Sequence, residues 1–179
     1  MGASGGDWDV TGNWNLARIP NDTDVVCIPD DATVVHSTGQ TIVRYLLSDG
    51  DITLSGGSLA AAEESHVQNL DLSGGTISSG SELTVTASLS WSSGSLGGSG
   101  TTVVAPGAAG VISGSGTKTL TGLLRNDGNI TWSAGTLEMA SGGNGPHLDN
   151  AGALTISGAV TTTTVTNEDT PRITNRVGA

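Results

Sequence analysis

The sequence predicts an all-β protein folded as a single-stranded parallel β-helix, or β-solenoid, with about 18–25 residues per coil. Short runs such as "DITLSGG" and "ALTISG" alternate apolar and polar residues, which is typical of short strands with one buried face. Glycine-containing turns separate these runs, and one motif recurs at a nearly fixed spacing. Aromatic residues make up only 3% of the chain, and Phe is absent, which suits a narrow aliphatic core.

An antiparallel β-sandwich is the alternative fold. A sandwich needs hairpin turns and longer alternating strands, and it gives no reason for a regular repeat. From about Ile28 onward the chain has room for roughly seven coils, which stack into a rod about 35 Å long at about 4.8 Å per coil.

Residues 1–29 are expected to form an amino-terminal cap and the first strand. This part carries Trp8 and Trp14 before the first repeat, and a cap is needed because the first coil of a solenoid otherwise exposes an unpaired edge. Cys27, the only cysteine, excludes an intramolecular disulfide. It is interpreted as a small buried hydrophobic residue, or alternatively as half of a disulfide whose partner lies outside this sequence.

Residues 30–179 are expected to form the solenoid, and several residue types mark its repeat. The pattern Ser-small-Gly-Ser/Thr-aliphatic recurs around the glycines, and a second pattern places an Asn after an aliphatic residue. Trp91 and Trp132 each stand just before a glycine motif, in the inward phase of a strand, so we expect them to be buried and to lie two coils apart. The repeat markers are Gly57, Gly75, Gly94, Gly135, Asn126, Asn150 and Asn175. Because the Asn175 repeat is cut short, we expect the native polypeptide to continue.

Six segments carry a resemblance to known proteins: "GDWDVTGNWNLARIPNDTDVVCIP", "LSGGSL", "LSGGTI", "LTVTASLSWSSGSLGGSGTTVVAPGAAGVISGSGTKTLTG", "LRNDGNITWSAGTL" and "LDNAGALTISG". Their order resembles the β-solenoid repeat regions of very large secreted or cell-surface bacterial proteins of the adhesin-like and RHS-associated kinds. The resemblance covers nearly the whole chain. It implies a stalk, a spacer or an adhesive surface, and it implies no catalytic residues.

Charge restricts the partners. A formal net charge of −11 repels phosphate backbones and anionic lipid surfaces, so nucleic acid is not an expected partner. No signal peptide and no apolar run of membrane-spanning length is visible, so membrane insertion is not expected either.

Few residues are candidates for chemistry. Asp22, Asp24, Asp49 and Asp51 lie in the turn-like stretches "NDTD" and "SDGD", whose oxygens are suitable calcium ligands, although Asx-turns explain these stretches without a metal. Arg125 with Asp127 and Asp149, or Arg44 with Asp49 and Asp51, are the best arginine–carboxylate groups, and we interpret them as solvated ion pairs.

The expected function is therefore structural or adhesive. We expect a non-enzymatic solenoid segment, without a cofactor, in a larger extracellular or surface-anchored bacterial protein. Its expected partners are the flanking domains of the same polypeptide and surface glycans or proteins. The alternative is a carbohydrate-binding or polysaccharide-degrading β-helix.

Overall fold

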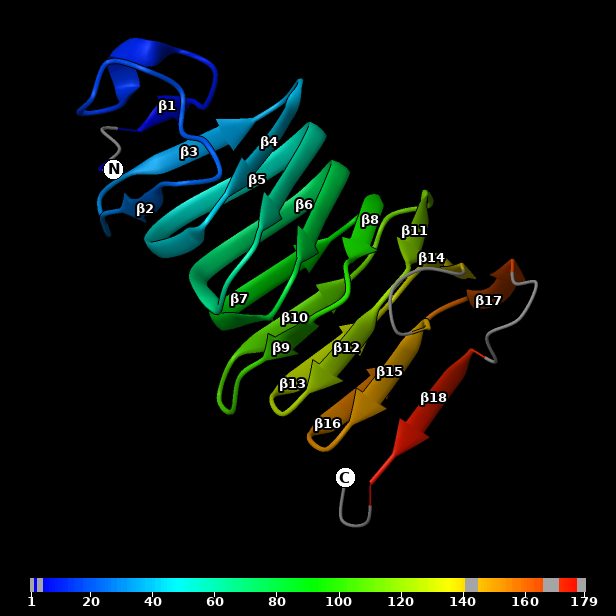
Figure 1. Cartoon of the computed structure of the whole chain (residues 1–179). Coiled ribbons are helices and arrows are strands. Elements are labelled where there is room, and N and C mark those ends of the chain that lie inside the picture. The colour runs from blue at the N-terminus through cyan, green and yellow to red at the C-terminus, as the bar shows by residue number, and fades with distance from the viewer. Residues whose placement is uncertain (1, 3–4, 141–144, 166–170, 177–179) are drawn as a thin grey trace.

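The fold is a β-solenoid of about 6 turns (Figure 1). The computed structural model describes residues 2, 5–140, 145–165 and 171–176. In this part of the chain every pairing between named strands is parallel, so the predicted solenoid is confirmed and the sandwich alternative is wrong. Coil length varies along the chain within the predicted 18–25 residues: paired residues are 18 apart near Asp51 but 25 apart near Asn150.

Each coil contributes a strand to each of three walls. The first wall contains β2 (Val25–Ile28), the opening segments of β5 (Tyr45–Ala61), β6 (Ser65–Ser79) and β7 (Glu82–Trp91), and then β9 (Thr101–Val104), β12 (Leu123–Asn126), β15 (His147–Asn150) and β18 (Arg172–Asn175). The second wall contains β1 (Gly6–Asp7), β3 (Thr33–His36), later segments of β5, β6 and β7, and then β10 (Ala109–Ile112), β13 (Asn129–Trp132) and β16 (Ala153–Ile156).

The third wall contains β4 (Gln40–Val43), the last segments of β5 and β6, and then β8 (Gly94–Gly97), β11 (Thr117–Leu120), β14 (Gly135–Ala140) and β17 (Val160–Val165). The long strands β5 and β6 turn their corners through register shifts, such as that between Ser48 and Asp51. Ser58 to Val67, a stretch whose alanines and glutamates favour a helix, is strand and corner in the structure.

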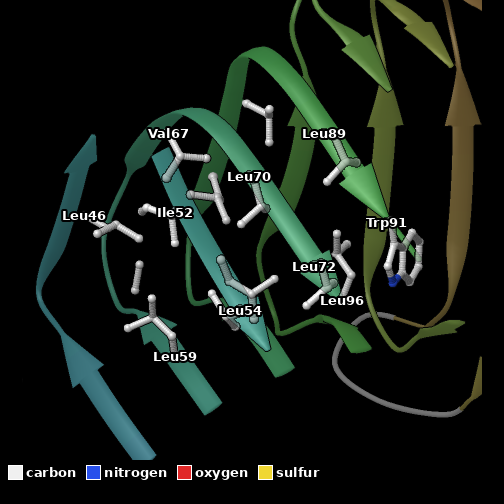
Figure 2. Close-up of a cluster of buried hydrophobic side chains, with 14 of the residues drawn as sticks. Leu46, Ile52, Leu54, Leu59, Val67, Leu70, Leu72, Leu89, Trp91 and Leu96 are labelled. Carbon is white, nitrogen blue, oxygen red and sulfur yellow. The ribbon is translucent and has the colours of Figure 1, made fainter. Parts of the chain in front are cut away.

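The core is a stack of aliphatic side chains between the walls (Figure 2). Alternation along each strand points every second residue inward, and the same inward position recurs in the next coil. One such column on the second wall contains the buried residues Leu54, Leu72, Trp91, Ile112 and Trp132 in consecutive coils, and it ends at Ile156 on β16, which is exposed. This column confirms that Trp91 and Trp132 are two coils apart, and both are buried.

The amino-terminal cap packs over the first coil through its two tryptophans. Trp8 is fully buried, and Trp14 is 3% exposed; their rings meet edge to face with centroids 4.8 Å apart. The backbone N–H of Trp8 donates to the carbonyl of Val35 at 2.8 Å, beside the pairing of β1 with β3. The only helical element in the described residues is the 3-10 helix η1 (Thr11–Asn13) of this cap, and none of these residues belongs to a helix of the length and apolarity that a membrane crossing requires.

Candidate functional site

The repeat glycines lie at corners where a side chain has no room. Gly57, Gly75, Gly94 and Gly135 all have positive φ, between +66° and +84°. A Cβ on Gly75 would lie 2.6 Å from the backbone of Gly56, and a Cβ on Gly94 would lie 2.6 Å from the carbonyl oxygen of Gly75. These residues let successive corners approach closely, so their role is in the stacking of coils.

The two core tryptophans also fix corners. The indole N–H of Trp91 donates to the carbonyl of Gly94 at 3.3 Å, and that of Trp132 donates to the carbonyl of Ala134 at 3.1 Å. Both indole rings are buried and their N–H groups are hydrogen-bonded within the protein, so neither ring offers a surface on which a sugar ring could stack.

The repeat asparagines form an inward-facing ladder at the end of the first wall. Val67, Val85 and Val104 occupy this column in the earlier coils, and Asn126, Asn150 and Asn175 occupy it in the later ones. Asn126 Nδ2 donates to Asn150 Oδ1 at 2.6 Å, and Asn150 Nδ2 donates to Asn175 Oδ1 at 3.0 Å. Asn126 Oδ1 also accepts a hydrogen bond from the backbone N–H of Gly128. The same amide therefore stabilises the corner that follows it and binds Asn150 in the next coil.

Cys27 is exposed, which corrects the expectation that it is buried. In β2 the inward positions are taken by Val26 and Ile28, so Cys27 between them must face outward. It lines an outer pocket of about 470 Å³ together with Leu47, Asp49 and His66. Among the described residues no group of three or more His, Cys, Asp or Glu side chains is arranged to hold a metal ion.

The four calcium candidates do not converge. Asp24 accepts from both terminal nitrogens of Arg18, at 2.7 and 2.8 Å, and from the backbone N–H of Asn21. The Arg18 guanidinium lowers the pKa of Asp24 below its usual range. Asp22 is exposed and Asp49 faces His66 at 3.7 Å, while Asp51 accepts from Asn69. The calcium site thus stays a prediction without a converging set of oxygens.

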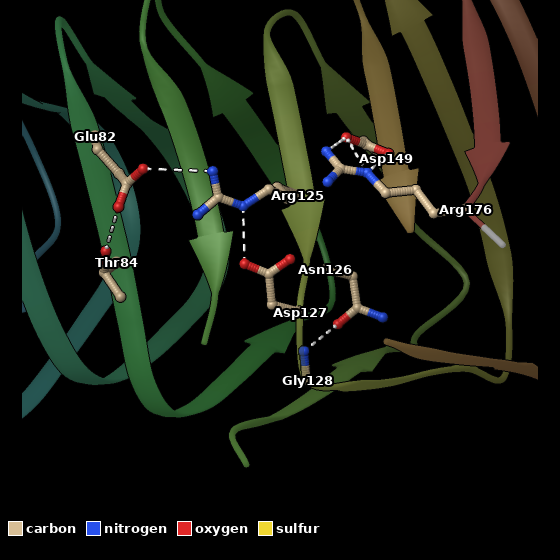
Figure 3. A network of polar contacts seen from close by, with 8 residues as sticks. All are labelled: Glu82, Thr84, Arg125, Asn126, Asp127, Gly128, Asp149 and Arg176. Carbon is tan, nitrogen blue, oxygen red and sulfur yellow. Dashed lines mark hydrogen bonds and ion pairs between the residues drawn. The ribbon is translucent and has the colours of Figure 1, made fainter. Parts of the chain in front are cut away.

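The first of the predicted arginine–carboxylate groups comes together in part, on the outer face of the first wall, where Arg125 contacts Asp127 but not Asp149 (Figure 3). Arg125 Nε lies 2.8 Å from Asp127, and Arg125 Nη1 lies 3.6 Å from Glu82. Because Glu82 is on β7 and Arg125 on β12, the latter pair spans β9, which lies between them. Asp149 pairs instead with Arg176, whose guanidinium lowers the pKa of that carboxyl.

The second group does not form. The guanidinium of Arg44 lies over the ring of Tyr45, 5.2 Å from its centroid. Asp51 belongs to a different set of polar contacts on the second wall, described below.

Lys118 is a buried residue that sequence reasoning missed. It is the only lysine of the chain, and its side chain is fully buried at a corner of the third wall. Its Nζ donates to the carbonyls of Gly114 and Gly116, at 2.8 Å each, and to that of Ala134 at 3.4 Å. Burial lowers the pKa of Lys118. Its inward position in "TKTL", two residues before Leu120, was the available signal.

The second wall carries a row of polar side chains on its outer face, which sequence reasoning also missed. Thr33 Oγ1 donates to Asp51, Asn69 Nδ2 donates to Asp51 at 2.9 Å, and Ser88 Oγ donates to Asn69 Oδ1 at 2.7 Å. The row crosses four consecutive strand segments, in β3, β5, β6 and β7. Beside it is a shallow hollow of about 180 Å³, which Asp71 also lines.

No family model matches the chain, and neither the curated proteins nor the solved structures compared with it include a match.

Proposed function

We propose that the chain is a non-enzymatic structural segment of a larger secreted or surface-anchored bacterial protein, and that it acts as a rigid, adhesin-like stalk or presentation surface. The observation that carries this proposal is the placement of β1 at one end of the solenoid and β18 at the other (Figure 1). A spacer has to receive the chain at one end and release it at the other, and a solenoid does this while each coil adds a constant length.

Continuous pairing accounts for the rigidity of such a rod. On the first wall the outward column runs from Cys27 through each coil to Thr174. These seven steps correspond to about 34 Å at about 4.8 Å per step. Hydrogen bonds along the axis and a close-packed aliphatic core resist bending over this length.

The proposed partners are the flanking domains of the same polypeptide and surface glycans or proteins, in an extracellular setting. The net charge of −11 supports the exclusion of nucleic acid. The ion pair of Arg176 with Asp149 supports a non-enzymatic role, because the guanidinium lowers the pKa of that carboxyl and an ionised carboxylate cannot act as a general acid. Carbohydrate binding is the second candidate, favoured by the hollow beside Asp71.

Rigidity is tested by the distance between two spin labels. Cys27 takes one label directly, and Thr174→Cys supplies the other. We expect a narrow distance distribution centred near ~34 Å, apart from the length of the label linkers. A control pair, Cys27 with Thr84→Cys, is separated by three steps and should give a distance near ~14 Å. A broad distribution for the longer pair alone contradicts a rod.

The cellular setting is tested with an antibody raised against the chain and applied to intact source cells. We expect staining without permeabilisation, and a band well above 17.7 kDa on a blot of the surface fraction. A signal confined to the cytosol, at the mass of the chain itself, contradicts the proposal.

A further inference from the structure

We propose that the outer face of the second wall, at the hollow beside Asp71, binds an extended neutral polysaccharide that runs parallel to the solenoid axis. This inference rests on and deepens the second candidate function, carbohydrate binding, and it is independent of the rod function, because a rod stays a rod whether or not the hollow is occupied. The hollow lies over β5, β6 and β7, where the polar row and a second column of polar residues run side by side.

The first column is a prearranged edge of the site. Asp51 accepts hydrogen bonds from Thr33 and Asn69, and Asn69 in turn accepts from Ser88. These contacts hold the four side chains in fixed positions before any ligand arrives. Prearrangement of this kind lowers the entropy lost on binding.

The second column supplies free polar groups. Thr53, Asp71 and Ser90 occupy the same outward position in consecutive coils. All three line the hollow, and none of their side chains has a hydrogen bond or ion pair within the described residues. Two hydroxyls and a carboxylate are therefore available to a ligand along one line.

The chemistry of this line matches the hydroxyl groups of a sugar. A carboxylate accepts two hydrogen bonds from neighbouring hydroxyls, and the Ser and Thr hydroxyls both donate and accept. The rungs repeat at about 4.8 Å, close to the length of one sugar in an extended β-linked chain. The hollow is smaller than the roughly 300–1,000 Å³ of a drug-sized pocket, so it takes one ring while neighbouring sugars lie along the wall.

Charge selects a neutral ligand. Asp71 and the net charge of −11 disfavour an acidic polysaccharide. A basic peptide is less suited, because Asp51 is already engaged by Asn69 and Thr33 and only one free carboxylate faces the hollow. One carboxylate among hydroxyls is a typical arrangement for recognising a polyol.

Titration of the isotopically labelled chain, followed by NMR, tests the proposal. The probes are β-1,4-linked hexasaccharides of glucose, xylose and N-acetylglucosamine, with oligogalacturonate and hexalysine as charged comparisons. We expect at least one neutral hexasaccharide to shift the amide signals of Thr53, Asp71 and Ser90, with millimolar or tighter affinity. Absence of shifts with every neutral probe, shifts that map to another wall, or binding of hexalysine alone would overturn the proposal.

Matched variants sharpen this test. Asp71→Ala should weaken binding of the neutral probe at least tenfold, and Asp71→Asn, which keeps one acceptor, should weaken it less. Thr155→Ala, in the same outward column but on β16 and outside the hollow, should leave the affinity unchanged. Equal affinity in Asp71→Ala and the unaltered chain, with the fold intact by circular dichroism, would also overturn it.

Discussion

The amide of Asn126 donates to the amide oxygen of Asn150 across one coil, at 2.6 Å, in the interior of the solenoid. Asn150 donates onward to Asn175, and its Nδ2 also reaches the carbonyl of Gly152. Buried amides of this kind are costly to leave without partners, so the ladder stabilises the register and the corners of the later coils, those of Asn126, Asn150 and Asn175.

Asn150→Ala is expected to lower the free energy of unfolding by about 1–3 kcal/mol. The substitution removes the central amide of the ladder, so Asn126 Nδ2 loses its acceptor on Asn150 and Asn175 Oδ1 loses its donor. Urea unfolding measures the loss. The control is Asn129→Ala, at an exposed outer position of β13, which should change stability by no more than about 0.5 kcal/mol. Equal effects of the two substitutions would show that the ladder contributes nothing.

Gly75→Ala is expected to destabilise the fold by more than about 3 kcal/mol, because the new Cβ meets the backbone of the preceding coil at 2.6 Å. Gly107 is the matched control, since it also has a positive φ but has open space around its Cβ position. Gly107→Ala should cost only the conformational strain, about 1–2 kcal/mol. Thermal unfolding of both variants separates close stacking from backbone strain, and a smaller loss for Gly75→Ala would contradict the stacking role.

Lys118→Met is expected to change how stability depends on alkaline pH. Burial lowers the pKa of Lys118 in the folded chain, so the unfolded chain binds more protons between that value and the ordinary lysine pKa of 10.5. The unaltered chain should therefore gain stability relative to Lys118→Met as the pH rises toward 10.5, by at most about 1.4 kcal/mol per pH unit. Urea unfolding at stepped pH measures this difference. A difference that is flat with pH, or that falls, would contradict the buried charge.

Asp149→Asn is expected to change how the stability of the fold depends on pH in the acid range. Arg176 lowers the pKa of Asp149, so the carboxylate contributes stability that is fully present above the ordinary aspartate pKa of 3.8 and is lost as the pH falls through the lower folded value. The stability difference between the unaltered chain and Asp149→Asn should be constant near neutral pH and shrink below 3.8. Chemical unfolding at stepped pH tests this, and a stability difference that stays constant as the pH falls below 3.8 would contradict the role of the Arg176 pair.

Much of the fold follows from local patterns in the sequence. Alternation and the spacing of glycine motifs predicted the coil and the two-coil separation of Trp91 and Trp132, because each strand run and each glycine motif is a short local pattern. The inward ladder of Asn126 and Asn150 was not predicted, because Asn in a turn motif is ordinarily explained by the turn alone. Cys27 was misjudged because a three-residue alternation leaves the inward phase open until the neighbouring coil is known.

The candidate sites were harder to predict for a related physical reason. The row from Thr33 to Ser88 joins residues from successive coils, and their side-by-side placement depends on how many residues each corner uses. The register shifts in β5 and β6 determine how many residues each corner uses, and the sequence of a single coil does not indicate where these shifts fall. Lys118 escaped notice because a lysine on a strand is ordinarily solvent-facing.

The burial of Lys118 also determines how the folded protein responds to reagents. Because it is the only lysine, the native chain offers amine-directed acylating agents and lysine-specific proteases no accessible side chain, while Cys27 offers thiol reagents an open one. Chemical modification of these two side chains therefore reports on folding. The thiol of Cys27 reacts in folded and unfolded molecules alike, whereas the amine of Lys118 reacts only in molecules whose third wall has unfolded.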